Sequence, residues 1–258
     1  MKFRTNLFFI LAFAIPILSH GWAQKGHDVT AHIAERHLTD KARHTVDSIF
    51  NGKSLVYWSN WMDNASHTDD FAYTLTWHYR NIDEGQTYED APRNTNGDMV
   101  SAITAIISEL KSDTISKHNA ELALRMLAHL VADLHNPMHM GHASDLGGTI
   151  YPVSFFGKAT NLHSVWDFDV VESAHNWSYS EWAEQIDILD KNEINEIVKG
   201  DAETWGKETY LIGKEIYDTT PPNYEISYDY IAKWAPTIEN QLLLGGLRLA
   251  SILNSIWQ

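Results

Sequence analysis

Histidine and aspartate are concentrated in one segment, HLVADLHNPMHMGHASDLGGT, residues 129 to 149. His129 and Asp133 are four residues apart, so on a helix they point in the same direction. Their neighbours are apolar, and a carboxylate buried among apolar groups is costly unless it is paired or bound to a metal. The segment therefore indicates either a buried histidine–aspartate pair or part of a metal site.

The same spacing occurs again in NLHSVWDFD, where His163 and Asp167 are four residues apart. His139 lies just beyond the end of the first predicted helix, where the chain can turn back. Two such pairs and one further histidine offer five nitrogen and oxygen ligands, a set that suits zinc. A single pair is more often a hydrogen-bonded pair on a helix face, but the repeated pattern favours a metal site.

Helical periodicity dominates the rest of the chain and predicts the elements that position these residues. The predicted helices are 28–38, 98–110, 118–135, 161–171, 181–189, about 194–217, and 227–253. Pro236 predicts a kink or a break in the last of them. We expect loops at 81–97 and 141–160, with a short strand at 151–156. The fold class is therefore all-α: a single mostly helical domain with a small β-hairpin-like excursion near 148–160.

Charge and cysteine content limit the classes of function. The 258 residues carry a net charge of -15, which disfavours nucleic-acid binding through lysine and arginine alone. An anionic substrate is still possible, because bound metal ions could supply positive charge locally. The chain has no cysteine, so the core and any metal ions must supply the stability that disulfides give other exported proteins.

The first 21 residues have the pattern of a secretory signal peptide. A basic start is followed by an apolar core at residues 7–18, which is short for a membrane span, and by small residues before Trp22. An N-terminal membrane anchor is the alternative. We expect cleavage before Trp22, a mature domain of residues 22–258, and a secreted or periplasmic location. Cleavage would free the α-amino group of Trp22, which is a competent metal donor.

Other candidate ligands lie upstream of the histidine-rich segment. His27 follows the expected new N-terminus by five residues, Asp63 lies in SNWMDNAS on a predicted helix, and His78 lies in TWHYRN. Asp63 could also be a surface acid, and His78 a packed core histidine. His135 is a poor ligand candidate, because it lies roughly 120° away from His129 around the helix axis.

These segments together resemble the trinuclear-zinc family of single-strand nucleases and 3′-nucleotidases, the S1/P1 nucleases. The matching segments, in order between residues 22 and 167, are WAQKGH, WMD, WHY, HLVADLHNPMH and NLHSVWD. The resemblance implies the phospholipase C/P1 nuclease type of fold for residues 22–258. The predicted helices after residue 170 contain no motif that can be compared.

The resemblance also implies three Zn²⁺ ions as cofactors and assigns their ligands. The first zinc would be held by Asp63, His78, His129 and Asp133. The second would be held by His139, His163 and Asp167. The third would be held by His27, Asp133 and Trp22, the last through its α-amino nitrogen and carbonyl oxygen. Asp133 would then bridge two ions.

The activity implied by the resemblance is hydrolysis of single-stranded DNA and RNA to 5′-phosphorylated products, with 3′-nucleotidase activity, by attack of a zinc-bridging hydroxide. Asp63 would take part in catalysis through the zinc that it holds. Asp83 is a candidate to orient the attacking water, or an ordinary loop acid. Tyr79 is a candidate for stacking a substrate base, or a core tyrosine. We expect a monomer that acts on nucleic acids and 3′-nucleotides and does not associate stably with membranes.

Two positions depart from the family pattern. In some relatives a lysine shortly after the acid at Asp83 and an asparagine beside the ligand at Asp167 assist the transition state. This chain has Gln86 and Phe168 near those positions, so neither contribution to transition-state stabilisation is expected in the same form.

Two other functions fit part of the pattern. A zinc-dependent phospholipase C shares the fold, the N-terminal tryptophan and the spacing, but typically has glutamate where this chain has Asp167. A non-catalytic, zinc-stabilised binding protein is the other alternative. Structural zinc sites are usually closed and often rich in thiolates, whereas this ligand set leaves positions open for water.

Overall fold

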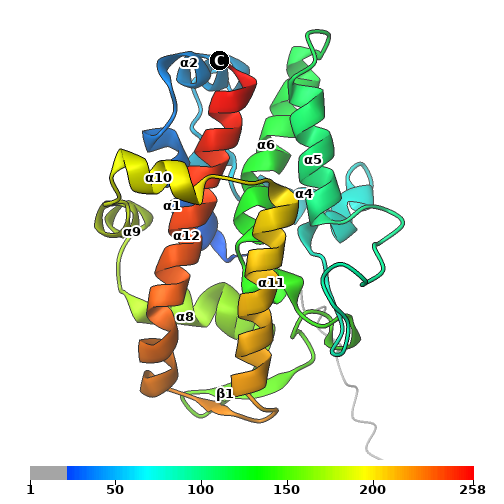
Figure 1. Cartoon of the computed structure of the whole chain (residues 1–258), viewed down its shortest axis with the longest axis vertical. Helices are drawn as coiled ribbons and strands as arrows, with labels where there is room; N and C mark the ends of the chain where they lie inside the picture. The colour runs from blue at the N-terminus through cyan, green and yellow to red at the C-terminus, as the bar shows by residue number, and fades with distance from the viewer. Residues whose placement is uncertain (1–21) are drawn as a thin grey trace, which may run out of the picture.

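Two helices far apart in the sequence form the centre of the fold. In the computed structural model, which describes residues 22–258, the long helix α12 (Tyr228–Ile256) packs along α1 (Gln24–Arg36) (Figure 1). Both helices contact α6 (Lys117–Leu134), which carries the histidine-rich segment at its C-terminal end. The N-terminal and C-terminal parts of the domain therefore support the same central helix.

The other helices surround this centre. They are α2 (Asp40–Ile49), α3 (Leu55–Trp58), α4 (Trp61–Ala65), the 3₁₀ helix η1 (Ala72–His78), α5 (Met99–Leu110), the 3₁₀ turns η2 (Pro137–Met140) and η3 (Ala143–Asp145), α7 (Leu162–Ser164), the π-helical segment η4 (Val165–Asp169), α8 (Val170–Ala174), α9 (Tyr179–Ile186), α10 (Lys191–Ile197) and α11 (Ala202–Thr219).

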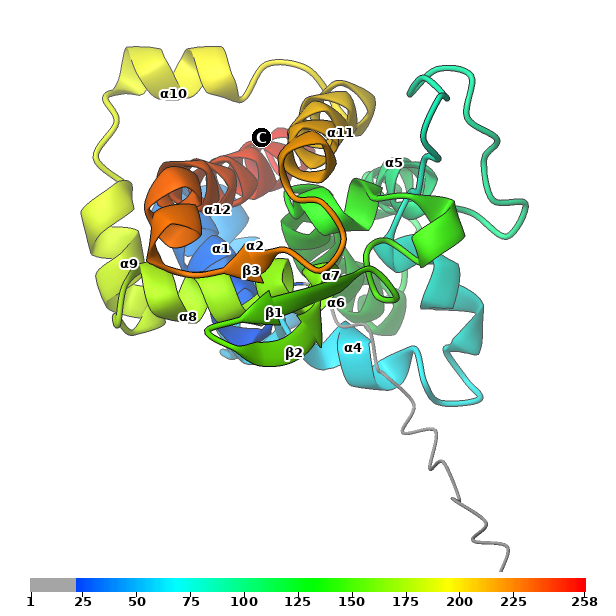
Figure 2. The same cartoon turned by 90° about the horizontal axis from the view of Figure 1, so that it is seen from below.

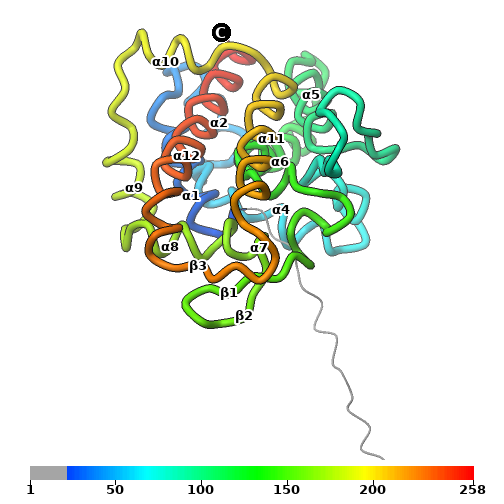
Figure 3. The backbone as a smooth tube through the Cα atoms, turned by 60° about the horizontal axis from the view of Figure 1, so that its bottom comes forward, coloured from blue at the N-terminus to red at the C-terminus, as the bar shows by residue number. Residues whose placement is uncertain are grey.

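A small sheet lies at one end of the helices. Strands β1 (Pro152–Phe155) and β2 (Lys158–Asn161) pair as an antiparallel hairpin, and β3 (Glu225–Ile226) pairs in parallel with β1 (Figure 2). The hairpin leads directly into α7, which begins the second histidine–aspartate pair. Helices α9 and α10 lie on the opposite flank of the domain from α5 (Figure 3).

The apolar core has two parts, which meet at α1 and α6. One fills the space between α2, α5, α6 and the end of α12, and the other is rich in tryptophan and lies around α8, α9 and the start of α12. Trp22, Trp166 and Trp182 are fully buried in the second part. The high tryptophan content is thus partly explained by packing.

The sequence predicted most of this architecture. The all-α, mostly helical class is confirmed, as is the β-hairpin-like excursion near 148–160, which corresponds to β1 and β2. The predicted helix 118–135 corresponds to α6, and the predicted loop 81–97 contains neither helix nor strand. The predicted signal peptide, residues 1–21, lies outside the described residues.

The prediction of one continuous helix at 194–217 was wrong. The predicted helix 194–217 is divided between α10 and α11, because Gly200 adopts a φ of +99° and Asp201 caps the new helix by accepting the Thr204 N–H at 2.9 Å. Of the kink or break predicted at Pro236, the break does not occur, because α12 continues through the proline. The buried side chains of Trp234 and Ile238, on either side of the proline, hold the helix against the core.

Between residues 22 and 258, none of the helices combines the length and the apolar character needed to span a membrane.

The contact between α1 and α12 depends on Gly246. A Cβ atom at this position would lie 2.5 Å from Ile33 Cβ, so a larger residue must push the helices apart. We expect Gly246→Ala to lower the free energy of unfolding by about 1 kcal/mol or more, since overpacking outweighs the gain in helix propensity. Urea unfolding measures this. The control is Asn240→Ala on the exposed face of α12, and equal stability of the two variants would contradict the prediction.

Candidate metal centre

The centre of the site is the last turn of α6. His129 and Asp133 are both completely buried, and His129 Nε2 lies 3.2 Å from Asp133 Oδ2. Helix α6 ends at Leu134, and Pro137 begins the turn η2, which brings His139 back toward the helix end. His139 Nδ1 lies 3.9 Å from Asp133 Oδ1. The local sequence thus gathers two histidines around one carboxylate.

A first group of possible metal ligands contains Asp63, His78 and His129, which come from α4, η1 and α6. His129 Nε2 lies 3.3 Å from Asp63 Oδ1 and 3.1 Å from His78 Nδ1. His78 Nδ1 also lies 3.1 Å from Asp133 Oδ2. The four residues predicted to share one metal ion therefore converge.

A second group contains His139, His163 and Asp167. His163 Nε2 lies 3.0 Å from Asp167 Oδ2, and His139 Nε2 lies 3.8 Å from Asp167 Oδ1. Asp167 lies in the π-helical segment η4, a rare element that is frequent at functional sites. The second histidine–aspartate pair is thus formed on a distorted helix rather than on the regular one predicted.

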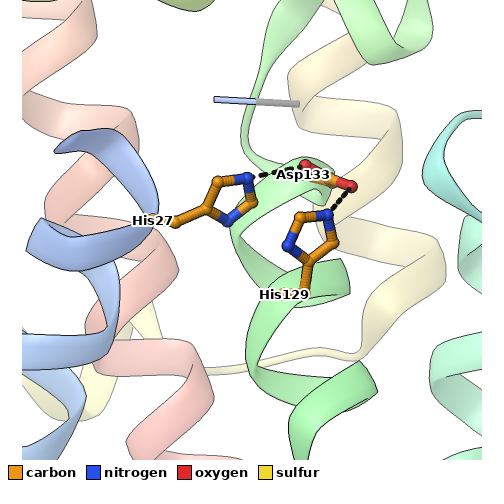
Figure 4. Close-up of side chains that lie close together, drawn as sticks. All are labelled: His27, His129 and Asp133. Atoms are coloured by element: carbon orange, nitrogen blue, oxygen red, sulfur yellow. Dashed lines mark ion pairs between the residues drawn. The ribbon is translucent and has the colours of Figure 1, made fainter. Parts of the chain in front are cut away.

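A third group joins α1 to α6. His27 is completely buried, and its ring stacks on that of His129 with centroids 4.0 Å apart. His27 Nε2 lies 3.4 Å from Asp133 Oδ1. Figure 4 shows Asp133 between the two histidines, paired with both. His27, His129 and Asp133 lie close enough together to hold one ion.

Trp22 also lies beside the cluster. Its side chain is completely buried and packs against Gly26. Gly26 directly precedes His27, which contacts Asp133. The N–H of the next residue, Ala23, donates to the carbonyl oxygen of Asp167 at 2.9 Å. Trp22, the predicted N-terminal ligand, therefore directly precedes a residue, Ala23, that is hydrogen-bonded to Asp167 of the second group.

Backbone carbonyls orient three of the histidines. The Nδ1 atoms of His129 and His163 donate to the carbonyl oxygens of Ser59 and Gly147 at 2.8 and 2.7 Å, and His139 Nδ1 donates to that of His78. Such contacts fix the orientation of each ring and direct Nε2 toward the carboxylates of the cluster, where it can serve as a metal ligand. Asn136 Nδ2 similarly donates to Asp167 Oδ1 at 2.6 Å.

Several buried polar atoms of the cluster lack hydrogen-bond partners among residues 22–258. They are both ring nitrogens of His27, Nε2 of His78, Nε2 of His139 and Oδ1 of Asp133. Buried polar groups are rarely left without partners, and those that are need an explanation such as an ion. A set of imidazole nitrogens and carboxylate oxygens is the donor chemistry that zinc prefers, so the residues fit a metal centre.

The charges within the cluster are strongly coupled. Burial and the neighbouring His129 lower the pKa of His27 to about 3, so this ring is neutral and able to bind a metal. Burial opposes protonation of His129, but Asp133 and Asp63 outweigh it and hold the pKa of His129 well above its usual value. Burial likewise opposes ionisation of Asp133, yet His129 and His139 hold its pKa well below the usual value. A metal ion would take the place of the His129 proton.

The cluster opens onto a cavity of about 220 Å³. Four of the candidate ligands line it: Asp63, His78, His139 and His163. Tyr79, predicted to stack a base, is half-buried and lines the same cavity, as do Asn81 and the exposed Leu146. A substrate in this cavity would therefore touch both the ligand groups and an aromatic ring.

The cavity lining does not include Asp83. Asp83 Oδ1 accepts the backbone N–H of Ser144 at 2.7 Å, and this hydrogen bond lowers the pKa of Asp83. Its side chain lines a neighbouring cavity of about 670 Å³ together with Gln86. Its role in orienting water stays a prediction. Phe168, beside Asp167, is about half exposed at 52%.

Some contributors to the site were missed from the sequence. Ser59 and Gly147 lie in segments that also carry candidate ligands, but they act through backbone carbonyl groups, so residue identity gave no signal for them. Asn136 lies inside the matching segment HLVADLHNPMH and could have been noticed there. It caps η2 as well as holding Asp167, because its Oδ1 accepts the N–H of Met138 at 3.0 Å.

A shared, buried carboxylate that joins three histidine–aspartate groups beside a cavity is an arrangement typical of metal-dependent hydrolases. Comparison with known proteins gives the family. The family model for S1/P1 Nuclease matches residues 22–258, and the chain therefore belongs to the S1/P1 nuclease family.

Named relatives agree over nearly the whole length. The chain is 26% identical to Endonuclease 4 of Arabidopsis thaliana, over 92% of this chain and 89% of the relative. It is 26% identical to Nuclease S1 of Aspergillus oryzae, over 94% of each chain, and 25% identical to Nuclease P1 of Penicillium citrinum, over 91% of this chain and 97% of the relative. The protein is accordingly an endonuclease-type hydrolase of a metal-dependent family, rather than a phospholipase C or a non-catalytic binding protein.

Two buried histidines at the end of α6 allow a matched test of ligand assignment. His129 faces the cluster, whereas His135 bonds the Val131 carbonyl through Nδ1 and accepts from Arg248 through Nε2. We expect His129→Gln to lower the bound metal content, and His135→Gln to keep it while losing about 1–3 kcal/mol of stability. Elemental analysis and urea unfolding measure the two effects. Equal metal loss in both variants would argue against the assignment.

Proposed function

We propose that the mature protein, residues 22–258, is a secreted or periplasmic zinc-dependent phosphodiesterase. It hydrolyses single-stranded DNA and RNA to 5′-phosphorylated products and removes the phosphate of 3′-nucleotides. One observation carries the proposal. Asp133, fully buried, has oxygens within 3.9 Å of histidines from all three ligand groups. We further propose that the enzyme acts as a monomer and forms no stable association with membranes.

Three Zn²⁺ ions fit this arrangement. Asp63, His78, His129 and Asp133 would hold the first; His139, His163 and Asp167 the second; and Trp22, His27 and Asp133 the third. When bound, such ions lower the pKa of coordinated water and offset negative charge on a phosphoryl group. The three aspartates offset only half of the six positive charges, so the site would attract phosphate despite the net charge of -15.

The protein's own side chains would bind and orient the substrate. Tyr79 would stack a base, which favours unpaired strands because the faces of paired bases are covered by their neighbours. The Nδ1 contacts of His129, His139 and His163 would keep their rings fixed while the substrate enters. Asp83 would orient the attacking water from the neighbouring cavity. The variant Asp83→Asn distinguishes this role from a purely structural one, because an asparagine oxygen can still accept the N–H of Ser144.

Activity on defined substrates tests the proposal. We expect cleavage of single-stranded DNA and RNA to 5′-phosphorylated products and release of phosphate from 3′-AMP, with little activity on duplex DNA, 5′-AMP or phosphatidylcholine. Asp133→Asn should lower kcat/KM by more than about 100-fold, since loss of an outer partner alone costs roughly 10–100-fold. A chelator should abolish activity and added zinc restore it. Preferential hydrolysis of phosphatidylcholine would refute the proposal.

The third zinc depends on the new N-terminus. A chain that begins at Trp22 offers a free α-amino nitrogen, whereas one extra preceding alanine turns this atom into an amide nitrogen that binds metals poorly. We expect three zinc ions per chain in the cleaved form and two in the extended form. N-terminal sequencing and elemental analysis of both forms measure this. The same zinc content in both would contradict the role of Trp22.

A further inference from the structure

A second cavity adjoins the metal centre. It has a volume of about 310 Å³, and three of its lining residues, Tyr79, Asn81 and Leu146, also line the metal cavity. The two cavities therefore share a boundary, and a chain molecule bound at the metal centre can continue across it. Asn81 Oδ1 lies at this boundary and has no hydrogen-bond partner among the described side chains and backbone.

The lining of the second cavity contains two arginines and one aspartate. The side chain of Arg93 is 41% exposed, whereas Arg80 and Asp98, which line the same cavity, are buried. Arg93 Nη2 pairs with Glu203 Oε2 at 2.5 Å, and Arg93 Nη1 lies 3.4 Å from Asp98 Oδ2. Arg80 Nη1 shares the same glutamate at 3.1 Å.

These contacts fix Arg93 without using all of its donors. A guanidinium has five N–H groups in a planar fork that matches a phosphate. Asp98 is itself committed, because its Oδ1 accepts the N–H of Ser101 at the start of α5. Holding the arginine in place reduces the entropy that it would lose on binding a ligand. Arg93 is therefore a preorganised cation at the edge of an open cavity.

The neighbouring cavity beyond Asp83 has the opposite balance of charged residues in its lining. Although its volume is larger, about 670 Å³, its lining includes the acids Asp83, Glu84 and Asp218. Its one lysine, Lys214, is paired with Asp218 at 2.8 Å. A polyanionic strand would be repelled there, so the phosphate backbone is directed toward the cavity of Arg93.

We propose that Arg93 binds a backbone phosphate of the nucleotide next to the cleaved bond, and so makes the enzyme prefer polynucleotides to mononucleotides. The proposal rests on the proposed function. A 3′-nucleotide carries only the phosphate that reacts at the metal centre, whereas a polynucleotide also places a second phosphate near the guanidinium. Charge-assisted, bidentate contacts are the strong form of this interaction.

The test compares two substrates in three variants of the full zinc-loaded enzyme. The substrates are a short single-stranded oligonucleotide and 3′-AMP, and the variants are Arg93→Gln, Arg93→Lys and, as the control, Arg43→Gln. Arg43 is exposed on α2 and lines neither cavity. We expect Arg93→Gln to raise KM for the oligonucleotide about tenfold, with kcat and the KM for 3′-AMP nearly unchanged.

Salt dependence adds a second readout, which a purely structural role would not change. The slope of log KM for the oligonucleotide against log salt should fall by about 0.7 in Arg93→Gln, the loss of one phosphate contact on a single strand. Arg93→Lys should restore most of the slope, and Arg43→Gln should leave it unchanged.

Two outcomes would overturn the inference. One is an equal loss on both substrates, which would mean that Arg93 only holds the loop 81–97 to Glu203. The other is an unchanged salt slope in Arg93→Gln. Failure of the proposed function looks different, because the unmodified enzyme would then cleave neither substrate.

Discussion

The site depends on one buried carboxylate. Asp133 has no exposed surface, and an ionised group there is stable only because positive or polar partners surround it. His27, His78 and His129 supply contacts from three helices, and His139 approaches from the turn after α6. Each of these elements is held by a different part of the fold. The partners that offset the cost of burying Asp133 are therefore in place only when the whole domain is folded.

The fold meets this requirement by bringing distant segments to one helix end. Packing of α12 on α1 fixes the helix that carries His27, and the β1–β2 hairpin leads into the segment that carries His163 and Asp167. Backbone carbonyl groups of Ser59, His78 and Gly147 then set the ring orientations. Precise geometry thus arises from rigid helices and from backbone contacts, which is how ligands are usually held for a metal.

The sequence predicted the parts of the site that follow a helical period. The spacing of His129 with Asp133 and of His163 with Asp167 can be read directly, because i and i+4 share a face. The π-helical form of the second pair, the carbonyls of Ser59 and Gly147, and the separation of Asp83 from the metal cavity could not be read. They depend on how the loops pack against the rest of the domain, and such contacts join residues that are far apart in the sequence.

The charge of the protein explains how such a site can select its substrate. A protein with a net charge of -15 has little of the non-specific attraction by which basic proteins hold duplex DNA. On the functions proposed above, binding would come from local features: metal ions held by the cluster, a stacking ring at Tyr79 and the fixed guanidinium of Arg93. Stacking on Tyr79 would require an unpaired base, and contact with both the metal centre and Arg93 would require a strand flexible enough to follow the two adjoining cavities. A single strand meets both conditions, whereas a duplex is stiff and keeps its bases covered.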